Sequence, residues 1–331
     1  MNEHNTHSIK RVVGASVLAL VVSIGSISLA YAGEKVDEVM DADPNGIVQI
    51  EHTSGTAEIR VWDKSQVSIS GELGDDTEEF IFERNGKTVE IIIKVEENRS
   101  WGNWNAGSID GDDILIYVPT NARVNYDAVN ANVNIDGVQG GSSLELVNGD
   151  ISAKNLNNSI SLQTVNGDID AQSMQGSLDV ETINGDVKIG HVGEQGIKVG
   201  AVNGNLNIDS NATEITAETV NGDMDFNLQG VSTVEANTVN GSLELSMSLL
   251  PSAVVNLSSV GGSIELELPS DVQAQFDIEA HAGGSIRNRL SDDEPQKAEY
   301  GPRRWLRFSA GNPDARVDIT TVNGRITLSE Q

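Results

Sequence analysis

Aliphatic side chains recur along residues 122–331 with a spacing set by one short motif. In this motif an aliphatic residue, Asn, Gly and a small polar or acidic residue precede a second aliphatic residue, as in VNGDI at Val165–Ile169. A weaker half-repeat, such as MQGSLDV at Met174–Val180, lies between successive copies, so each period consists of two similar halves. The Asn of the motif recurs every 18 or 19 residues, at Asn130, Asn148, Asn166, Asn184, Asn203, Asn221 and Asn240.

Two all-β architectures fit this pattern. Asn-Gly between β-type segments is a strong hairpin signal and would give an antiparallel meander. A meander, however, does not require an identical residue at every eighteenth or nineteenth position. A solenoid does, because each coil lies about 4.8 Å from the last and equivalent residues form columns. The repeat therefore predicts a right-handed parallel β-solenoid with coils of 18–19 residues.

The solenoid assigns a role to each position of the motif. We expect the Asn column to form a ladder of side-chain hydrogen bonds, each contributing about 1 kcal/mol. The neighbouring Gly is expected to adopt a positive φ at the corner. The aliphatic residues on both sides of the motif are expected to fill the interior. Strict alternation slips once between Ala171 and Met174, which predicts a bend or bulge there.

The segments that flank the repeat are less regular but still have β character. Residues 33–121 are expected to form an irregular β capping region that covers the open edge of the first coil. The solenoid is expected over 122–331, with an insert at 288–305, before RVDITTVNGRITL closes the array. The segment 97–113 is expected to be a loop.

The first 32 residues have the pattern of an export signal. Lys10 and Arg11 precede an apolar run, and Ala30-Tyr31-Ala32 supplies a small-x-small cleavage site. An uncleaved anchor is the alternative, since the run nearly reaches the ~20 residues of a membrane span. The signal pattern predicts an exported protein. Because no later stretch is apolar enough to span a membrane, we expect the periplasm rather than the cell surface or the extracellular medium.

Composition narrows the partners. The chain has no Cys, which excludes disulfides and thiol chemistry, and its formal net charge is −29. Such a charge repels phosphate backbones, so nucleic acid is not expected as a partner.

Several segments resemble a bacterial family of proposed adhesins with β-strand repeats, related to the head-domain adhesins named for their Gly-Ile-Asn motif. The resemblance rests on IRVWDKSQVSISGELG, DILIYVP, the VNGDI series, and RRWLRFSAG followed by TTVNGRI. It implies a β-solenoid at the cell envelope with an adhesive role, and it supplies no catalytic residues.

Catalytic and metal sites are not expected. His52, His191 and His281 are far apart in sequence, and no phosphate loop, zinc spacing or nucleophile elbow is present. The acidic residues Asp168, Asp170, Asp223 and Asp225 keep open a carbohydrate-active enzyme on a β-helix. The column Asp150, Asp168 and Asp186 keeps open a calcium-stabilised spacer, although we expect these residues to accept turn N–H bonds instead. No cofactor is expected.

Two groups of residues are candidates for ligand contact. Trp101 and Trp104 would stack on a sugar or a partner protein, with capping of the solenoid as the favoured alternative. Arg303 and Arg304 belong to a basic group with Arg287, Arg289 and Arg307, for which pairing with the chain's own carboxylates is the favoured alternative. The sequence thus predicts a non-enzymatic envelope interaction or scaffold protein whose partner, an envelope protein or a polysaccharide, and whose oligomeric state it leaves open.

Overall fold

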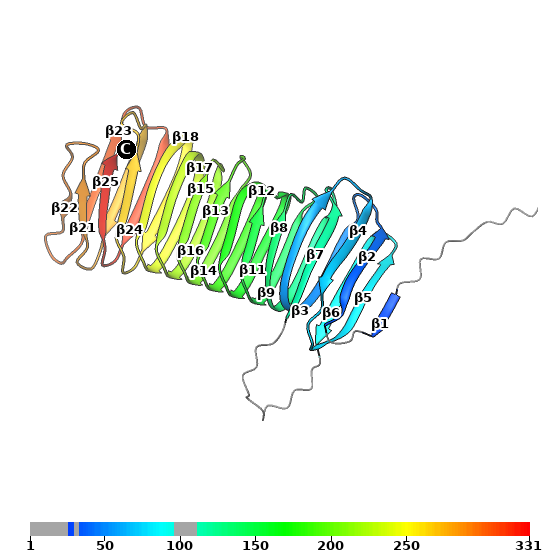
Figure 1. Cartoon of the computed structure of the whole chain (residues 1–331). Helices are drawn as coiled ribbons and strands as arrows, with labels where there is room; N and C mark the ends of the chain where they lie inside the picture. The colour runs from blue at the N-terminus through cyan, green and yellow to red at the C-terminus, as the bar shows by residue number, and fades with distance from the viewer. Residues whose placement is uncertain (1–25, 30–32, 96–110) are drawn as a thin grey trace, which may run out of the picture.

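The protein is one elongated stack of β-coils (Figure 1). The computed structural model describes residues 26–29, 33–95 and 111–331, and over these residues it contains 25 strands and no α-helix. The predicted all-β solenoid is confirmed. The described part of the chain has no helix of the length and apolar character needed to cross a bilayer.

The central coils are stacked in parallel at the predicted interval. Asn166 pairs with Asn184, and Ile169 pairs with Val187, so equivalent positions 18 residues apart lie side by side. The strands of this region are β8 (Arg123–Asp136), β9 (Ser142–Asn148), β10 (Ile151–Lys154), β11 (Asn157–Asn166), β12 (Ile169–Asn184), β13 (Val187–His191), β14 (Ile197–Asn203), β15 (Leu206–Ser210), β16 (Glu214–Asn221), β17 (Met224–Asn240), β18 (Leu243–Ser259) and β19 (Ile264–Leu268).

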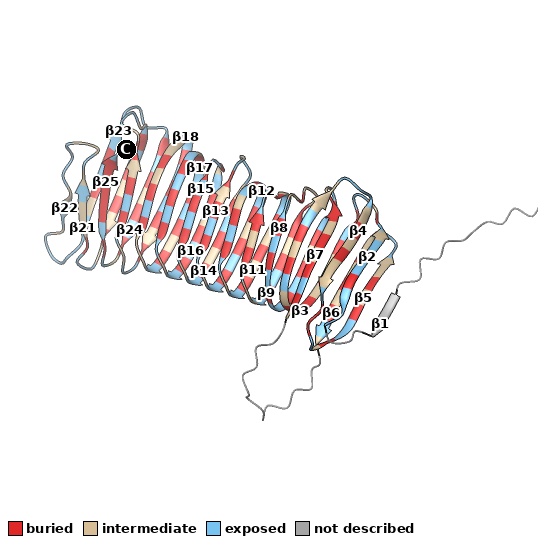
Figure 2. Ribbon diagram, viewed as in Figure 1, coloured by how far each residue is buried: buried red, intermediate tan, exposed pale blue. Residues whose placement is uncertain are grey.

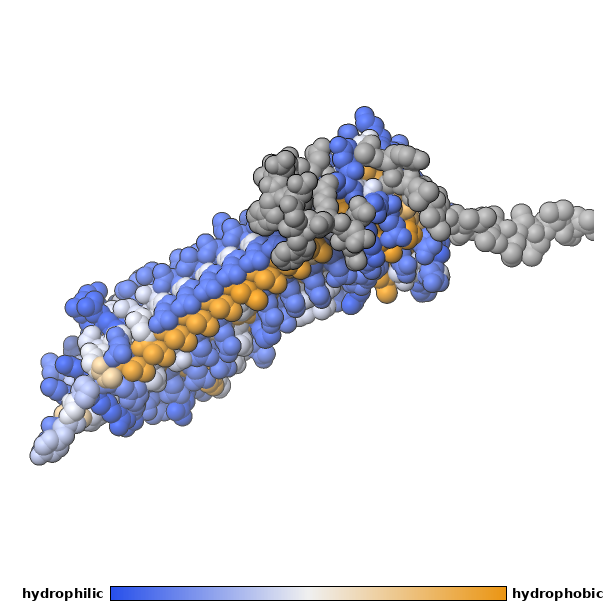
Figure 3. All heavy atoms as spheres, turned by 90° about the horizontal axis from the view of Figure 1, so that it is seen from below, coloured by the Kyte–Doolittle hydropathy of each residue, from blue (hydrophilic) through white to orange (hydrophobic). Residues whose placement is uncertain are grey.

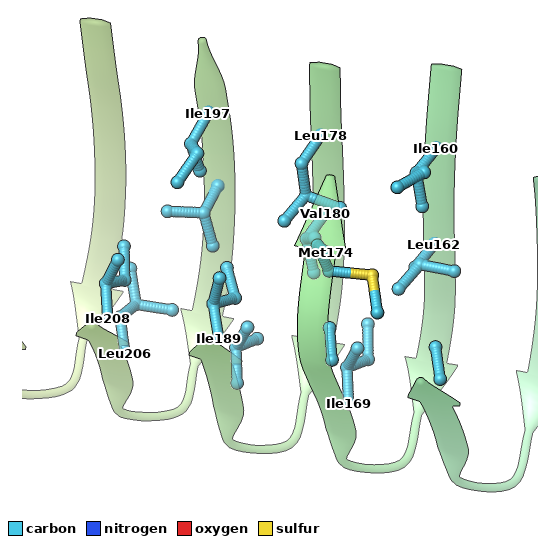
Figure 4. Packing of buried hydrophobic residues seen from close by; sticks show 14 of the residues in the cluster. Ile160, Leu162, Ile169, Met174, Leu178, Val180, Ile189, Ile197, Leu206 and Ile208 are labelled. Carbon is cyan, nitrogen blue, oxygen red and sulfur yellow. The ribbon is translucent and has the colours of Figure 1, made fainter. Parts of the chain in front are cut away.

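The core is a single narrow interior that runs along the stack. Buried and exposed residues alternate along each strand, because successive side chains of a strand point to opposite faces (Figure 2). Aliphatic residues of neighbouring coils, such as Ile169 and Ile189, pack into this interior together with Met174 (Figure 4).

The predicted slip between Ala171 and Met174 is present. The pairing of β12 with β13 shifts register between these two residues, and Ser173 has a φ of 59°. Asn155 holds the equivalent place one coil earlier, with a φ of 54°. These two coils therefore bend at a residue in the left-handed region, and in the second coil the bend brings Met174 back to the interior.

The N-terminal end does not follow the order of the chain. Strand β3 stacks directly on β8, while β6 and β7 pair with the other side of β3 and so lie outside it. The antiparallel strands β4 and β5 then cover β7 and β6, and β2 and β1 pair with the outer edges of β4 and β5. The strands are β1 (Ser26–Leu29), β2 (Lys35–Asp41), β3 (Ile47–Trp62), β4 (Gln66–Glu72), β5 (Thr77–Asn85), β6 (Thr88–Val95) and β7 (Asp112–Pro119).

The C-terminal end corrects one expectation. The RVDITTVNGRITL segment does not form the outermost coil, because β24 pairs with β18 on one side and with β20 on the other. The last coil of the chain thus lies between the β18 coil and the β20 coil, although the β20 coil precedes it in sequence. Outside both, β23 pairs antiparallel with β20, and Phe276 stacks on Phe308 at 4.5 Å between ring centroids. The strands are β20 (Ala274–Ala280), β21 (Ser285–Asn288), β22 (Gln296–Lys297), β23 (Arg304–Ala310), β24 (Ala315–Thr321) and β25 (Arg325–Glu330).

Candidate functional site: an apolar groove along the solenoid

The corner of each central coil is built by the motif Thr-Val-Asn-Gly-Asp and its variants. In the coil that begins this corner at Thr182, the Thr182 hydroxyl is buried and donates to the Gly167 carbonyl oxygen of the preceding coil at 3.3 Å. The Asn184 side chain donates to Asn166 at 2.9 Å. A Cβ on Gly185 would overlap the Gly167 carbonyl oxygen. Thr, Asn and Gly therefore each serve the stacking of one coil on the next.

The Asn ladder is continuous. Each side-chain amide from Asn148 to Asn240 donates to the side-chain oxygen of the Asn in the preceding coil, beginning at Asn130. The distances, in order from Asn148, are 2.8, 2.8, 2.9, 2.8, 2.9 and 3.0 Å. At about 1 kcal/mol net per bond, the ladder favours this one register of the coils.

The Gly residues of the corner are needed for a reason other than the expected positive φ. Gly149 has a φ of 139°, but Gly167, Gly185, Gly204, Gly222 and Gly241 are not in the left-handed region. At each of these five positions a Cβ would overlap the carbonyl oxygen of the Gly in the preceding coil. The expectation of a positive φ along the column was therefore wrong, and close approach of two backbones accounts for the Gly.

The acidic column of the corner forms a second ladder. One carboxylate oxygen of Asp168 accepts the Asp186 backbone N–H of the next coil at 2.8 Å, and Asp150 accepts that of Asp168 at 2.9 Å. Asn205 takes the same place and accepts the Asp223 N–H at 2.9 Å. Each side chain thus bonds to the next coil rather than to its own turn. Within the described residues no group of three or more acidic or His side chains has the arrangement of a metal site.

The Val of the motif is the exception, because its side chain points outward. We expected this position to fill the interior, and that expectation was wrong: Val165 is 37% exposed and Val147 is 44% exposed. Thr164, the residue before Val165, occupies the interior instead and is 4% exposed. Eight consecutive coils expose the aliphatic residue of this position and bury the residue before it, which is Thr in four coils and Ala, Leu or Ser in the others. The exposed residues form a row, here named the apolar stripe: Val129, Val147, Val165, Ile183, Val202, Val220, Val239 and Val260.

The apolar stripe ends at polar residues. Thr53 takes the place of Val129 in the β3 coil, as Ser54 pairs with Asn130. At the other end the row continues through Val322, which is half-buried, and ends at His281 in the outermost parallel coil. In the space-filling view the stripe runs along the length of the solenoid between polar side chains (Figure 3).

An acidic row lies beside the stripe, two residues earlier in each coil. Five of its positions carry carboxylates, and Gln163, Gly200, Asn237 and Ser258 occupy the others. The carboxylates, here named the acidic row, are Glu51, Asp127, Glu145, Glu181 and Glu218.

Electrostatic repulsion is strongest at the N-terminal end of this row, where three carboxylates follow one another in adjacent coils. Partial burial and the charges of Glu145 and Glu51 raise the pKa of Asp127, although Gln49 donates a hydrogen bond to it at 2.7 Å. A bound cation would relieve this repulsion.

The stripe and the acidic row together line a groove of about 1180 Å³. The described residues that line it run from Glu51 in β3 to Val260 after β18, so the groove spans most of the stack. Among these residues Lys94 is the only Lys or Arg, and it is paired with Glu51 at 2.9 Å. The groove is therefore apolar along its length and negative at its side.

The histidines do not form a catalytic centre within the described residues. His52 is buried between Asp112 and Tyr126, at 3.0 Å from a carboxylate oxygen and 2.7 Å from the hydroxyl. Because an ionised carboxylate only accepts, Nε2–H donates to Asp112 and Nδ1 accepts from Tyr126. Tyr126 has no exposed surface, and burial raises its pKa, so its hydroxyl is kept protonated and out of contact with solvent.

Asp112 completes this buried network. Burial alone would raise its pKa, but hydrogen bonds from His52, Thr77 and the Gly74 backbone outweigh burial and leave the pKa below its ordinary value. The network joins β3, β7 and β8 to the loop before β5, which fastens the N-terminal cap to the first coils.

The other two histidines are also accounted for structurally. His191 is buried and lies 2.8 Å from the Gly176 carbonyl oxygen and 3.3 Å from the Ser210 hydroxyl, and its burial lowers its pKa. His281 is partly exposed, 3.7 Å from Glu279.

The acidic residues considered for glycoside chemistry form two pairs, Asp168 with Asp170 and Asp223 with Asp225, which lie three coils or roughly 14 Å apart. In the first pair both carboxylates accept structural hydrogen bonds, Asp168 from the Asp186 N–H at 2.8 Å and Asp170 from the Gln172 side chain at 2.7 Å. Asp223 accepts the Ser242 N–H at 2.7 Å.

The two candidate ligand-contact groups have different outcomes. Trp101 and Trp104 lie outside the described residues. Arg303 donates to Glu279 at 2.6 Å, and Arg307 donates to both oxygens of Asp277 at 3.0 Å, so these two pair with the chain's own carboxylates. Arg304 is exposed on the same hairpin, and Arg287 and Arg289 are exposed near β21.

Fold and groove define the class of the protein: a β-solenoid with hydrogen-bonded corner ladders and one continuous apolar groove. Within that class the chain belongs to the Toastrack DUF4097 family, a domain of unknown function, whose sequence profile matches residues 47–329. This membership agrees with the resemblance to proposed adhesins found in the sequence.

Comparisons with solved structures give distant likenesses. A proposed cell adhesion protein from Clostridium sporogenes is 11% identical, with 90% of this chain and 100% of that chain covered and a TM-score of 0.23. A proposed adhesin from Bacteroides fragilis is 13% identical, with 89% and 97% covered and a TM-score of 0.37. A proposed lipid-binding protein from Parabacteroides distasonis is 10% identical, with 89% and 97% covered and a TM-score of 0.35. No curated protein matches the chain.

Proposed function

We propose that the protein is a non-enzymatic, exported interaction scaffold of the cell envelope, adhesin-like in role, which binds its partner through the apolar groove. Export and a periplasmic location rest on the sequence pattern of the first 32 residues. The non-enzymatic role is supported by the structural hydrogen bonds that Asp168, Asp170 and Asp223 accept and by the burial of His52 and His191.

The observation that carries the proposal is the inverted corner. A solenoid gains stability by burying Val and exposing Thr, yet four coils bury Thr and expose Val or Ile, and in all eight the outward residue is Val or Ile. Scattered exposed aliphatic residues need no explanation, whereas a contiguous row rimmed by polar residues is typical of an interaction site.

The stripe is large enough to supply useful binding energy. Its residues are 37–45% exposed. Covering this surface gives about 0.6 kcal/mol per residue and ~5 kcal/mol in total, taking about 1.5 kcal/mol for complete burial of one such side chain. This is enough for a specific but modest contact before the ordering costs of binding are subtracted.

The test compares two sets of substitutions in the purified protein. In the stripe variant, Val165, Ile183, Val202 and Val220 become Thr, which keeps the β-branched shape and strand propensity and removes apolar surface. In the matched control, Val192→Thr and Val254→Thr alter exposed Val residues elsewhere, with exposures of 57% and 40%.

Each protein is immobilised and incubated with an envelope extract, and the captured components are quantified by mass spectrometry. We expect a defined set that the parent and the control enrich and the stripe variant loses. Equal capture by the stripe variant and the parent, with both folded by circular dichroism, would exclude the groove as the binding surface.

A further inference from the structure

We infer that the occupant of the groove is an extended polypeptide segment that alternates apolar and basic side chains. This inference rests on the proposed function, because it assigns the chemistry of the partner to the same groove. Three features of the described residues support it: the charge beside the stripe, the width of the stripe, and the residue types that line the groove.

Charge favours a cationic partner, although Lys198 already pairs with Glu181 at 2.9 Å and Lys94 with Glu51 at 2.9 Å. The acidic row follows one side of the stripe, and on the other side the acidic ladder that includes Asp150, Asp168 and Asp186 lies beyond the Asn ladder. A ligand seated on the stripe therefore has carboxylates on both flanks. A Lys or Arg side chain extends an apolar stem and places its charge several ångströms away, which suits a ligand whose apolar part lies in the groove.

The same charge disfavours other occupants. A second copy of the chain would bring a matching acidic row against the first, with a net charge of −29 on each molecule. An anionic lipid headgroup would meet repulsion along the whole groove. A polysaccharide would find no Trp, Tyr or Phe among the described lining residues on which a sugar ring could stack.

The width of the stripe favours an extended chain over a helix. Seven coil steps separate Val129 from Val260, which is roughly 34 Å at 4.8 Å per step. In each coil the stripe is one side chain wide. An extended chain presents a single row of alternate side chains to such a stripe, whereas an amphipathic helix presents a broader apolar face.

The length fixes the size of the segment. At about 3.3 Å per residue, an extended chain of ~10 residues spans the stripe. Its alternate side chains point the same way, so about five apolar side chains face the stripe. The basic side chains start on the opposite face of the segment, and their long flexible stems bend round its edge to place their charges beside the acidic row.

The test uses labelled ten-residue peptides and the purified full-length protein, with binding measured by fluorescence anisotropy. The probe alternates leucine and lysine; the control peptides alternate serine with lysine and leucine with glutamate. Palmitate and vesicles of anionic phospholipid are separate arms. The charge variant combines Glu145→Gln, Glu181→Gln and Glu218→Gln. Its matched control combines Asp225→Asn, Glu235→Gln and Glu244→Gln, which removes the same charge from exposed residues that do not line the groove.

We expect the leucine–lysine peptide to bind, and to bind at least tenfold more weakly to the charge variant and to the stripe variant than to the parent or the matched control. We expect the serine–lysine and leucine–glutamate peptides to bind at least tenfold more weakly than the probe. Equal binding of the serine–lysine peptide, or an equal loss in the matched charge control, would show only general attraction to an acidic protein and would overturn the inference.

Failure of the inference is distinguishable from failure of the proposed function. If palmitate or the vesicles bind in a stripe-dependent manner and the leucine–lysine peptide does not, the groove remains a binding surface but its occupant is a lipid, and the inference is wrong. If the stripe variant also captures the same envelope components as the parent, the proposed function itself is wrong.

Discussion

The Gly column of the corner offers the sharpest test of the stacking geometry. Gly185 and Gly200 lie in the same coil, but their surroundings differ completely. A Cβ at Gly185 would overlap the Gly167 carbonyl oxygen, whereas a Cβ at Gly200 would have no heavy atom within 4 Å. Gly185→Ala and Gly200→Ala therefore make the same chemical change with opposite expected effects.

The cost of Gly185→Ala follows from the hydrogen bonds that the added methyl group would disturb. To make room, the corner must move away from the preceding coil. Five hydrogen bonds join the two coils here: Gly167 N–H to Asn184 at 3.0 Å, Ile169 N–H to Asp186 at 3.0 Å, Thr182 to Gly167 at 3.3 Å, Asn184 to Asn166 at 2.9 Å and Asp186 N–H to Asp168 at 2.8 Å. Losing three of these at about 1 kcal/mol each gives a cost of ~3 kcal/mol. Gly200→Ala should be neutral or stabilise by up to ~1 kcal/mol, because Ala loses less backbone entropy in a strand.

The free energy of unfolding of both variants is measured by urea titration, monitored by circular dichroism and by Trp fluorescence. Coincident transitions in the two signals establish that a single free energy of unfolding applies. Amide hydrogen exchange adds the location, since faster exchange should be confined to the coils on either side of Gly185. A Gly185→Ala protein within 1 kcal/mol of the parent, or equal losses at the two positions, would refute the close-approach argument.

Three further predictions concern titration, the acidic ladder and the repeat. Burial lowers the pKa of His191 from its ordinary value near 6.5, so the folded state binds fewer protons than the unfolded state and stability should fall as pH drops below about 6.5; His191→Gln should flatten that part of the pH profile in urea titrations, and an unchanged slope would contradict it. Asp168→Asn should change stability by less than ~0.5 kcal/mol because an amide oxygen still accepts the N–H bond, whereas Asp168→Ala should cost ~1 kcal/mol; a saturable rise in melting temperature at micromolar Ca²⁺ that Asp168→Asn abolishes would instead indicate a calcium site. Deleting residues 166–183 removes one whole coil and should leave a cooperative melt, while deleting residues 166–174 mismatches the columns and should cost several kcal/mol; equal damage from both deletions would count against the column argument.

The sequence predicts that the coils stack, but it does not predict the order in which the coils at the ends of the stack lie. Identical residues at intervals of 18–19 imply columns, because parallel coils place equivalent positions side by side. The segments around Gly262, Gly284 and Gly324, however, have similar patterns, and chain order suggests that they stack in that sequence. A Cβ at Gly324 would overlap the Gly262 carbonyl oxygen and one at Gly284 would lie close to the Gly324 carbonyl oxygen, so the spatial order is 262, 324, 284. Only the long-range pairing of β24 determines this, and no local pattern encodes it.

The Asn ladder can be predicted from the sequence, whereas the outward position of the apolar stripe cannot. An Asn at every corner has one efficient partner, the Asn of the next coil, so its role follows from its spacing. The stripe was assigned to the interior because Val is more hydrophobic than Thr, and a pattern read by hydropathy places Val165 inside and Thr164 outside.

Counting residues between interior positions shows why the structure reverses that assignment. Thr164 and Ile169 both point inward although they are five apart, so alternation breaks at the Asn-Gly corner; Ala171 and Met174 are three apart and supply a second break. The two breaks together restore an even total, which keeps the remainder of the coil in phase.

Either Thr164 or Val165 could in principle be the interior residue next to the corner. In this coil the Thr164 hydroxyl donates to the carbonyl oxygen of Gly149 at 3.2 Å, which Val cannot do, so Thr164 is the residue that points inward. That choice places a side chain outside but does not require it to be apolar, since a second Thr or a Ser would serve the strand as well. The aliphatic character of eight consecutive outward positions is therefore not explained by the packing of the coils, and contact with a partner is the explanation that the proposed experiments test.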